Sequence, residues 1–361
     1  MQQLYIKTVT IHYLGPWIDN HFRFKKNNLI FGITEEEGNL DLIDILRAIK
    51  DIRKFHKIDL KYLHQDLKKN IDFNYHKFLL KITYFNSKKE TYIKINKNLK
   101  VDYKESVNFN LISRVYIKFI EKEEEIDQIL KDLETRKERI NFIKNRIIVF
   151  LKVENLLKES KIEKLLDFSY KFSGQTFFST ISPKVIVHAM NKFDTRLLDV
   201  FYMVDHVEKN LKPNLLQQLA EYTGEKIRKK ILFVEGISDR LILEAIAKRN
   251  KIKDLVIIDT GGIANINFEA IAKLNNFLNA KALIDYDNEK TRISNRLIHV
   301  LKRRAIEWYL DQNILHKNNL NDFKMSSHNK ILMAENFKNT YFKSKNYKQL
   351  EFEVLNLYNS F

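Results

Sequence analysis

The feature that most constrains the fold is a regular alternation of strand-like and helix-like segments beginning near residue 229. Three apolar runs, "KILFVE", "DLVIID" and "KALIDYD", have the length and composition of buried strands. Two segments of helical character, "SDRLILEAIAKRN" and "ANINFEAIAKLNNFLNA", separate these runs. Strands that alternate with helices in this way form βαβ units. We therefore predict an α/β region here, with a parallel sheet flanked by helices.

The first half of the chain predicts a mixed α/β region as well. Residues 3–33 are strand-like, and the last part becomes a continuous apolar run, as expected for a buried strand. Residues 78–97 predict a β-hairpin that turns at Asn86-Ser87-Lys88. Residues 39–55 predict a helix, whose apolar face contains Leu42, Ile45, Leu46 and Ile49.

The remaining segments complete the predicted domain organisation. Residues 118–146 predict a charged helix with internal ion pairs. Its apolar heptad repeat is not sustained long enough to indicate a coiled coil. A strand in "RIIVFLKVEN", a helix through Ser169 and a strand in "QTFFSTI" follow. After residue 301 a helical segment gives way to a basic, Asn-rich tail. We expect a domain over 1–225, a second over 226–300, and a basic extension over 301–361 that packs on the second.

Composition excludes several classes of function. The chain of 361 residues contains no Cys, so thiolate metal sites, cysteine nucleophiles and disulfides are excluded. The ten His form no close pair of the HxxH kind, which argues against a zinc enzyme. No apolar run reaches about 18 residues, and the N-terminus lacks the features of a signal peptide. We expect a cytoplasmic protein that does not associate with membranes.

The formal net charge is +17. A basic balance of this size favours binding to polyanions, because lysines displace the counterions condensed on phosphates. The alternative is a coding bias that enriches Lys, Asn and Ile together. Charge thus indicates a nucleic-acid partner without identifying a site.

Acidic residues stand at the ends of the predicted C-terminal strands. Glu235 ends the first strand, Asp239 lies in the first turn of the next helix with Ser238 as its expected N-cap, and Asp285 and Asp287 end the third strand. Ligands of open parallel sheets gather at the carboxyl ends of the strands. Converging carboxylates provide the hard oxygen ligands that Mg²⁺ requires, and the cation relieves their repulsion. The sequence therefore predicts a Mg²⁺ or Mn²⁺ site.

Each of these residues also has a purely structural interpretation. A Glu at a strand end can be solvated, and an acid such as Asp239 also favours the positive end of a helix. Glu289 and Asp259 are weaker ligand candidates. Gly261 and Gly262 are expected to form a turn, or alternatively to let a substrate approach the backbone.

The order "FVEGISD", "IIDTGGIANI" and "LIDYDNE" resembles the Toprim domain of topoisomerases, primases and related nucleases. The resemblance covers about 60 to 75 residues, roughly the size of a small domain. It implies a site in which Mg²⁺ or Mn²⁺ polarises a phosphate and activates water. The catalytic residues it implies are Glu235, Asp239, Asp285 and Asp287. The metal ligands are the same four residues and Glu289. The residues that approach substrate are Gly236, Gly261 and Gly262.

The first two hundred residues resemble the ABC-type ATPases of the RecF, Rad50 and OLD (overcoming lysogenisation defect) kind, but with altered motifs. The phosphate-loop segment departs from GxxxxGK[ST], because Asn39 and Leu40 follow Gly38 and Gly32 lies one residue too far away. Glu35, Glu36 and Glu37 place negative charge where a triphosphate would lie. In the family, a strand corresponding to "IIVFLKVEN" ends in an Asp-Glu pair, and Leu151 and Lys152 stand at those places here. The family's later "STHSP" switch corresponds to "STISP" here, with Ile181 in place of the His. The resemblance implies a degenerate ATPase scaffold that does not hydrolyse ATP and binds no nucleotide cofactor.

An ABC-like region followed by a Toprim unit resembles the OLD family. It implies an endonuclease acting on nucleic acid, with DNA favoured over RNA, in bacterial or phage defence, as a homodimer or with a separate ATPase. The alternative is an inactive nucleic-acid-binding or regulatory subunit that pairs with such an ATPase. A topoisomerase needs a further domain with a nucleophilic Tyr, and a primase needs a zinc domain that a chain without Cys does not provide.

Overall fold

Contacts in the computed structural model divide the chain into two units, Met1–Phe193 with Leu197–Lys209, and Asp194–Arg196 with Asn210–Phe361. The second unit starts earlier than the expected boundary at 225–226, because α8 (Pro213–Thr223) contacts α10 (Phe268–Leu274). The structure describes residues 4–15, 17, 20–32, 39–63, 79–96, 98–135, 147–156, 159–172, 174–194, 196–204, 207–209, 211–223, 229–275, 279–286, 296–303, 305–309, 334 and 345–361.

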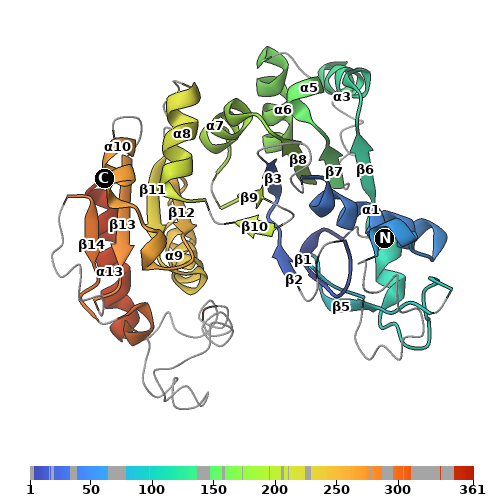
Figure 1. Ribbon diagram of the computed structural model, residues 1–361, viewed down its shortest axis with the longest axis horizontal. Coiled ribbons are helices and arrows are strands. Elements are labelled where there is room, and N and C mark those ends of the chain that lie inside the picture. The colour runs from blue at the N-terminus through green and yellow to red at the C-terminus, as the bar shows by residue number, and fades with distance from the viewer. Residues whose placement is uncertain are drawn as a thin grey trace. The chain divides into compact units, whose positions relative to one another are not determined.

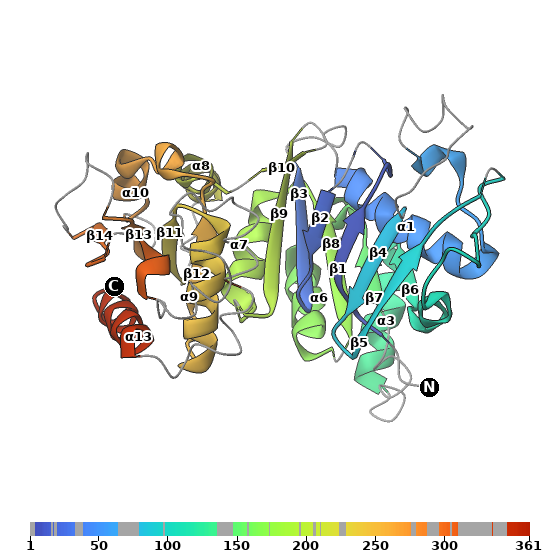
Figure 2. The same cartoon turned by 90° about the horizontal axis from the view of Figure 1, so that it is seen from below.

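The first unit is built around β3 (Asn27–Gly32), in which every residue is buried. This confirms the buried strand predicted from its continuous apolar run. β3 lies between two parallel neighbours in a six-stranded sheet, in which only the pairing of β10 with β9 is antiparallel (Figures 1 and 2). The strands in spatial order are β10 (Val207–Lys209), β9 (Leu198–Val204), β3, β8 (Gln175–Thr180), β7 (Ile147–Phe150) and β6 (Ile117–Ile120).

A second, antiparallel sheet belongs to the same unit. Its strands in order are β2 (Asn20–Arg23), β1 (Ile6–Ile11), β4 (Leu80–Tyr84) and β5 (Ser87–Ile93). The hairpin turns at Phe85-Asn86, so the predicted turn was placed too late. Ser87 already pairs with Tyr84, which puts Ser87 and Lys88 in the strand.

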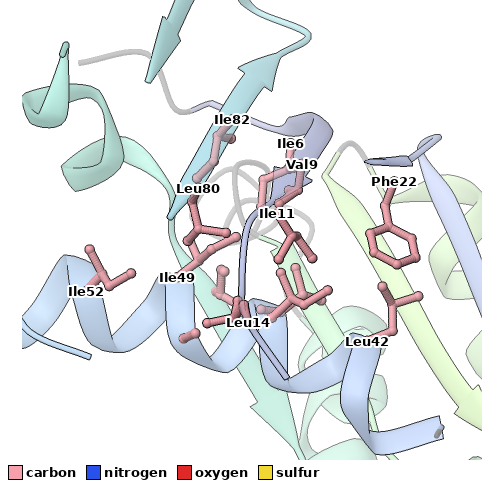
Figure 3. Close-up of a cluster of buried hydrophobic side chains, with 14 of the residues drawn as sticks. Ile6, Val9, Ile11, Leu14, Phe22, Leu42, Ile49, Ile52, Leu80 and Ile82 are labelled. Atoms are coloured by element: carbon pink, nitrogen blue, oxygen red, sulfur yellow. The ribbon is translucent and has the colours of Figure 1, made fainter. Parts of the chain in front are cut away.

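Helix α1 (Asn39–Phe55) has the bounds predicted from the sequence. Its predicted apolar face is correct, since Leu42, Ile45, Leu46 and Ile49 are buried. Figure 3 shows this helix beneath the antiparallel sheet, with Ile49 close to Leu80 and Ile11. Burial of each such side chain contributes about 1.5 to 3 kcal/mol, so this interface is a main source of stability for the unit.

The predicted charged helix and the predicted helix through Ser169 are present as α3 (Glu123–Thr135) and α6 (Glu159–Lys171). The unit also contains α5 (Val153–Leu156), α7 (Pro183–Lys192) and the 3-10 turns η1 (Leu60–Tyr62) and η2 (Phe109–Arg114), which were not predicted from the sequence. α6 packs against both α3 and α7. The last part of the predicted charged helix, 136–146, lies outside the described residues.

The second unit contains a four-stranded sheet that is parallel throughout, as predicted from the βαβ pattern. Its spatial order is β12 (Leu255–Asp259), β11 (Lys230–Val234), β13 (Asn279–Ile284) and β14 (Ile298–Val300). α9 (Ile237–Arg249) and α13 (Lys345–Asn359) share one apolar core with one face of the sheet. α10 contacts β13 and α8.

Two predictions for this unit were wrong in extent. The helix expected over residues 264–280 is a 3-10 turn, η3 (Ile263–Asn265), followed by the short α10. Asn side chains set its limits, because Asn267 Oδ1 accepts the amide of Ala270 at 3.0 Å and Asn275 Nδ2 donates to the carbonyl of Ala280 at 2.8 Å. Of the helix expected after residue 301, the described part is a 3-10 turn, η4 (Ile306–Tyr309).

A buried carboxylate ties α13 to the rest of the second unit. Glu353 Oε1 lies 2.8 Å from His299 Nε2 in β14 and accepts the amide of Lys302 at 3.0 Å. Its Oε2 accepts the hydroxyl of Tyr309 at 2.6 Å. Burial raises the pKa of Glu353, but the hydrogen bonds from His299, Tyr309 and the amide outweigh it, so the pKa is lowered. The carboxylate therefore stays ionised while it clamps β14 and η4 onto α13.

None of the helices in the described part of the chain combines the length and the apolar character required to cross a bilayer.

Candidate functional site

The candidate site lies where the strand order of the second unit reverses. From β11 the chain passes through α9 to β12 on one side, and then returns through α10 to β13 on the other side of β11. The gap between the carboxyl ends of β11 and β13 is thus a topological switch point, where parallel sheets bind ligands. Glu235 directly follows β11 and Asp285 directly follows β13.

The structure brings these two acids together. The main-chain amide of Asp285 donates to Oε1 of Glu235 at 3.0 Å, and both residues are half-buried. The contact is possible because β11 and β13 are parallel and paired, with Phe233 opposite Ala282. The carboxylate of Glu235 therefore points across the sheet edge toward β13, rather than outward into solvent.

Asp239 lies in the first turn of α9 with 7% of its surface exposed. Its Oδ2 accepts the amide of Gly236 at 2.9 Å, which satisfies one of the free donors at the start of the helix. The N-cap is Gly236, and the expectation that Ser238 caps the helix was wrong. Ser238 is instead a buried residue inside the first turn. Asp239 thus fixes the main chain immediately after Glu235.

A second loop closes over the end of β11. The amide of Gly262 donates to the carbonyl of Glu235 at 2.7 Å, and the amide of Thr260 donates to Val234 at 3.0 Å. Gly261 and Gly262 have φ values of +72° and +126°, so the turn predicted there needs glycine. Both sides of the Glu235 main chain are therefore held by hydrogen bonds.

The backbone at Gly236 does not require a glycine. Its φ of −135° and ψ of 167° are extended values open to any residue. A Cβ built at this position would meet Asp239 Oδ2 at 3.7 Å and Ser238 Oγ at 3.8 Å, which are ordinary contacts. A tight turn therefore does not explain the glycine, and the approach of a substrate stays a prediction.

One basic residue at this edge was missed by sequence reasoning. Arg240 Nη1 lies 3.4 Å from Asp259 Oδ2 at the end of β12, and its Nε donates to Glu244 Oε1 at 3.1 Å. Asp259 is 8% exposed, so the ion pair compensates a nearly buried carboxylate. The sequence signal was the i,i+4 spacing of Arg240 and Glu244. Arg240 places a positive charge one residue beyond Asp239.

Asp287 and Glu289 lie outside the described residues. Within the part of the chain that the structure describes, no group of three or more His, Asp or Glu side chains is arranged to hold a metal ion. Glu235 and Asp285 are a donor pair of the type that binds Mg²⁺, which takes one or two carboxylates together with phosphate and water. The two residues are therefore of the chemical type that holds such an ion, and their strand ends adjoin.

The carboxyl edge of the first unit's sheet carries three of the positions that were compared with ATPase motifs in the sequence. Leu151 and Lys152 directly follow β7, and Ile181 directly follows β8. Glu35, Glu36, Glu37 and Gly38 lie outside the described residues. Sequence reasoning missed Glu154 in α5, whose Oε2 accepts the amide of Ile181 at 3.2 Å and the hydroxyl of Thr180. The signal was an acid shortly after a buried strand.

Comparisons with known proteins add a limited result. No family model and no curated protein matches the chain. The SMC head domain from Thermotoga maritima is similar with a TM-score of 0.35 and 11% identity, over 58% of this chain and 97% of that one. The recombination mediator protein RecF-ATPrS of the RecFOR pathway is similar with a TM-score of 0.24 and 11% identity, over 83% of this chain and 94% of that one. Likeness at this level leaves function to be argued from the chain's own residues.

Proposed function

We propose that the second unit is a metal-dependent nuclease of the OLD/Toprim type that hydrolyses phosphodiester bonds in nucleic acid. The observation that carries the proposal is the contact between strand ends, in which Glu235 Oε1 accepts the amide of Asp285 at 3.0 Å. Two acids thus share the switch point of a parallel sheet. The formal net charge of +17 supports a polyanionic substrate.

Glu235 and Asp285 would hold Mg²⁺ or Mn²⁺, with Asp287 and Glu289 as further proposed ligands. The ion would supply Lewis-acid stabilisation of the phosphate and activation of water. Asp239 contributes by holding the Gly236 amide, so that the Glu235 carboxylate keeps its direction. Gly262 serves the same end from the other side through its hydrogen bond to the Glu235 carbonyl. Such preorganisation lowers the cost of ordering the site during the reaction.

The first unit is proposed to be a degenerate ABC-type scaffold without ATP hydrolysis. Leu151, Lys152 and Ile181 support this, because side chains that cannot ligate Mg²⁺ or activate water stand at the sheet edge. The chain would then act as a homodimer or with a separate ATPase, and the separate ATPase would supply any nucleotide-dependent regulation. By resemblance to OLD proteins, the setting is cytoplasmic bacterial or phage defence.

The test is cleavage of supercoiled plasmid and of single-stranded DNA and RNA by purified full-length protein. Reactions contain Mg²⁺, Mn²⁺ or EDTA, and are repeated with Asp285→Ala. We expect cleavage that requires the metal and is lost in the variant. Glu221→Ala is the matched control, since it removes an exposed acid on α8.

Cleavage that persists in EDTA or in Asp285→Ala would contradict the proposed mechanism. Binding without cleavage under any metal would favour the inactive subunit that pairs with an ATPase. Saturable ATP hydrolysis by the same preparation would show that the first unit is a working ATPase.

A further inference from the structure

Large aromatic side chains are exposed around the end of α1 in the first unit, where Tyr103 contacts His56 and Tyr116 contacts Arg53. Tyr103 is 56% exposed, Phe55 is 52% exposed and Tyr116 is 41% exposed. We call this surface the aromatic platform, and it consists of Arg53, Phe55, His56, Tyr103, Phe109 and Tyr116. Exposed aromatic area that clusters on a folded protein marks an interaction surface.

The platform is held rigidly by its own contacts. The Tyr103 hydroxyl lies 2.6 Å from His56 Nδ1. The rings of His56, Tyr103 and Phe109 meet edge-to-face, with centroids 5.2 to 5.9 Å apart. Side chains that are already ordered lose little conformational entropy when a ligand stacks on them. The exposed ring of Tyr103 is therefore ready for binding.

A cation is built into the same surface. The Arg53 guanidinium lies 3.8 Å from the centroid of the Tyr116 ring, and its Nε donates to the carbonyl of Ser113 at 3.2 Å. This geometry keeps a flat, positively charged group beside an exposed ring. Arginine held against an aromatic ring can pair with phosphate while it continues the stack.

The backbone beneath the platform is strained. His56, Leu99 and Asn108 have φ values of 55°, 58° and 51°, in the left-handed region that residues other than glycine rarely adopt. Val101 donates its amide to the His56 carbonyl at 2.9 Å, which joins two of the segments involved. Strain of this kind persists where the surrounding structure enforces it, often at binding sites.

The charge of the surrounding surface selects the partner. Residues 50–61 and 98–118 contain nine Lys and Arg against four Asp and Glu. Lys54, Lys57 and Lys104 are exposed and lie next to platform residues in the sequence, and Lys54 Nζ is 4.7 Å from the centroid of the Phe55 ring. Two of the acids are engaged locally, since Glu105 pairs with Lys94 at 3.1 Å and Asp102 accepts the amide of Lys104 at 3.0 Å.

We infer that the aromatic platform binds single-stranded nucleic acid, with bases stacked on Tyr103 and Tyr116 and phosphates on the surrounding lysines. Aromatic rings within a basic surface are the combination that binds unpaired strands, because every base has a face that can stack. Paired bases in a duplex do not offer this face. This site lies in the first unit and does not depend on the proposed nuclease chemistry.

The test is fluorescence anisotropy of the full-length protein with labelled 20-residue oligothymidylate and oligouridylate, in EDTA so that no cleavage occurs. Stacking contributes about 1 to 3 kcal/mol per base, so Tyr103→Ala with Tyr116→Ala should weaken binding at least about 10-fold. The matched control replaces Tyr170 and Phe352 with Ala, because both are exposed and lie outside the platform. The control should bind within about twofold of wild type.

Two further variants keep the test decisive. Tyr103→Phe keeps the ring and removes only the hydroxyl beside His56, so it should retain binding if stacking is responsible. Lys54→Gln with Lys57→Gln should reduce the slope of log K against log salt by about 0.7 for each phosphate that these side chains no longer neutralise. The assay contains EDTA, so metal-dependent contacts at the proposed nuclease site do not contribute, and this separates the two sites.

Wild-type affinity in the double Tyr variant would overturn the inference, as would an equal loss in the control. Equal affinity for a duplex of the same length, with the same loss in the variant, would also overturn it. Comparison of the two oligonucleotides then assigns DNA or RNA as the preferred strand.

Discussion

The six-stranded sheet of the first unit and the parallel sheet of the second use the same contact at the carboxyl ends of their strands, with different consequences. In the second unit, Glu235 after β11 accepts the amide of Asp285 after β13. In the first unit, Glu154 beyond β7 accepts the amide of Ile181 after β8. A carboxylate that ties two strand ends is therefore a structural device, and does not by itself mark a metal site. The difference is the residue that donates the amide.

That donor decides what chemistry the edge can perform. Asp285 brings a second carboxylate to the switch point, whereas Ile181 brings an apolar side chain. Oε2 of Glu154 also accepts a hydrogen bond from the Thr180 hydroxyl, so the same oxygen joins α5 to two successive residues at the end of β8. Among the described residues, the edge of the second unit thus combines a strand-tying acid with a second acid at the adjoining strand end, which is a combination that can share a cation.

The largest expected effect comes from removing each strand-tying charge in turn. Glu235→Gln should lower metal-dependent cleavage at least about 100-fold, because it removes a proposed ligand. Glu154→Gln should leave cleavage within about twofold and change only the stability of the first unit. Initial rates on plasmid measure both. Equal losses in the two variants would remove the distinction between the edges.

The second comparison concerns what supports the edge of the second unit. Glu353→Ala should lower its free energy of unfolding by about 3 kcal/mol, because it leaves His299, Tyr309 and the Lys302 amide without their buried acceptor.

The two Trp residues allow this effect to be assigned to one unit. Trp17→Phe leaves Trp308, in η4, as the single fluorescent reporter during urea unfolding. Phe352→Ala is the control on the same helix, since Phe352 is 64% exposed and should change stability by less than about 0.5 kcal/mol. A shift of similar size in the control would contradict a role specific to Glu353.

Two glycines of the site provide a smaller and internally matched test. Gly262→Ala should cost about 1 to 3 kcal/mol, because φ of +126° is strained for any side chain. Gly236→Ala should be close to neutral in stability, because its backbone is extended and its Cβ would make ordinary contacts. Urea unfolding measures both. Loss of cleavage in a stable Gly236→Ala protein would indicate that substrate approaches this residue.

The smallest expected effect is a pH dependence of the second unit's free energy of unfolding that originates in Glu353. Its pKa in the folded protein is lowered, so the ionised form stabilises the fold above the ordinary pKa of Glu. This stabilisation is lost as the pH falls through the lowered value. Glu353→Gln should flatten the decline in stability below about pH 4.5, as followed by Trp308 fluorescence. An unchanged acid profile would show that the decline has another source.

Much of the fold follows from local patterns, and the exceptions have physical causes. α1 and β3 could be predicted because the spacing of their apolar residues matches the faces that are buried. β14 could not, since its three residues pair only after β13 is in place. α13 lies in a basic, Asn-rich tail, and its only signal is a helical spacing of apolar residues.

The candidate site divides in the same way. Acids at strand ends are visible in the sequence, but strand order is not, and it is the order that places β13 beside β11. The local roles of Asp239 and Gly236 were hidden because capping depends on which residue reaches back to a free amide. The ion pair of Arg240 in α9 could not be predicted, because its partner Asp259 lies at the end of β12 and is distant in the sequence.

The clamp formed by Glu353 has a consequence for evolution of the site. Asp285 is anchored through its amide to Glu235, and Lys302 is anchored through its amide to Glu353. Two carboxylates on other elements thus hold the main chain just after β13 and just after β14. Either acid can be lost in evolution only together with a new acceptor for these amides, since a buried donor left unpaired costs about 1 to 3 kcal/mol.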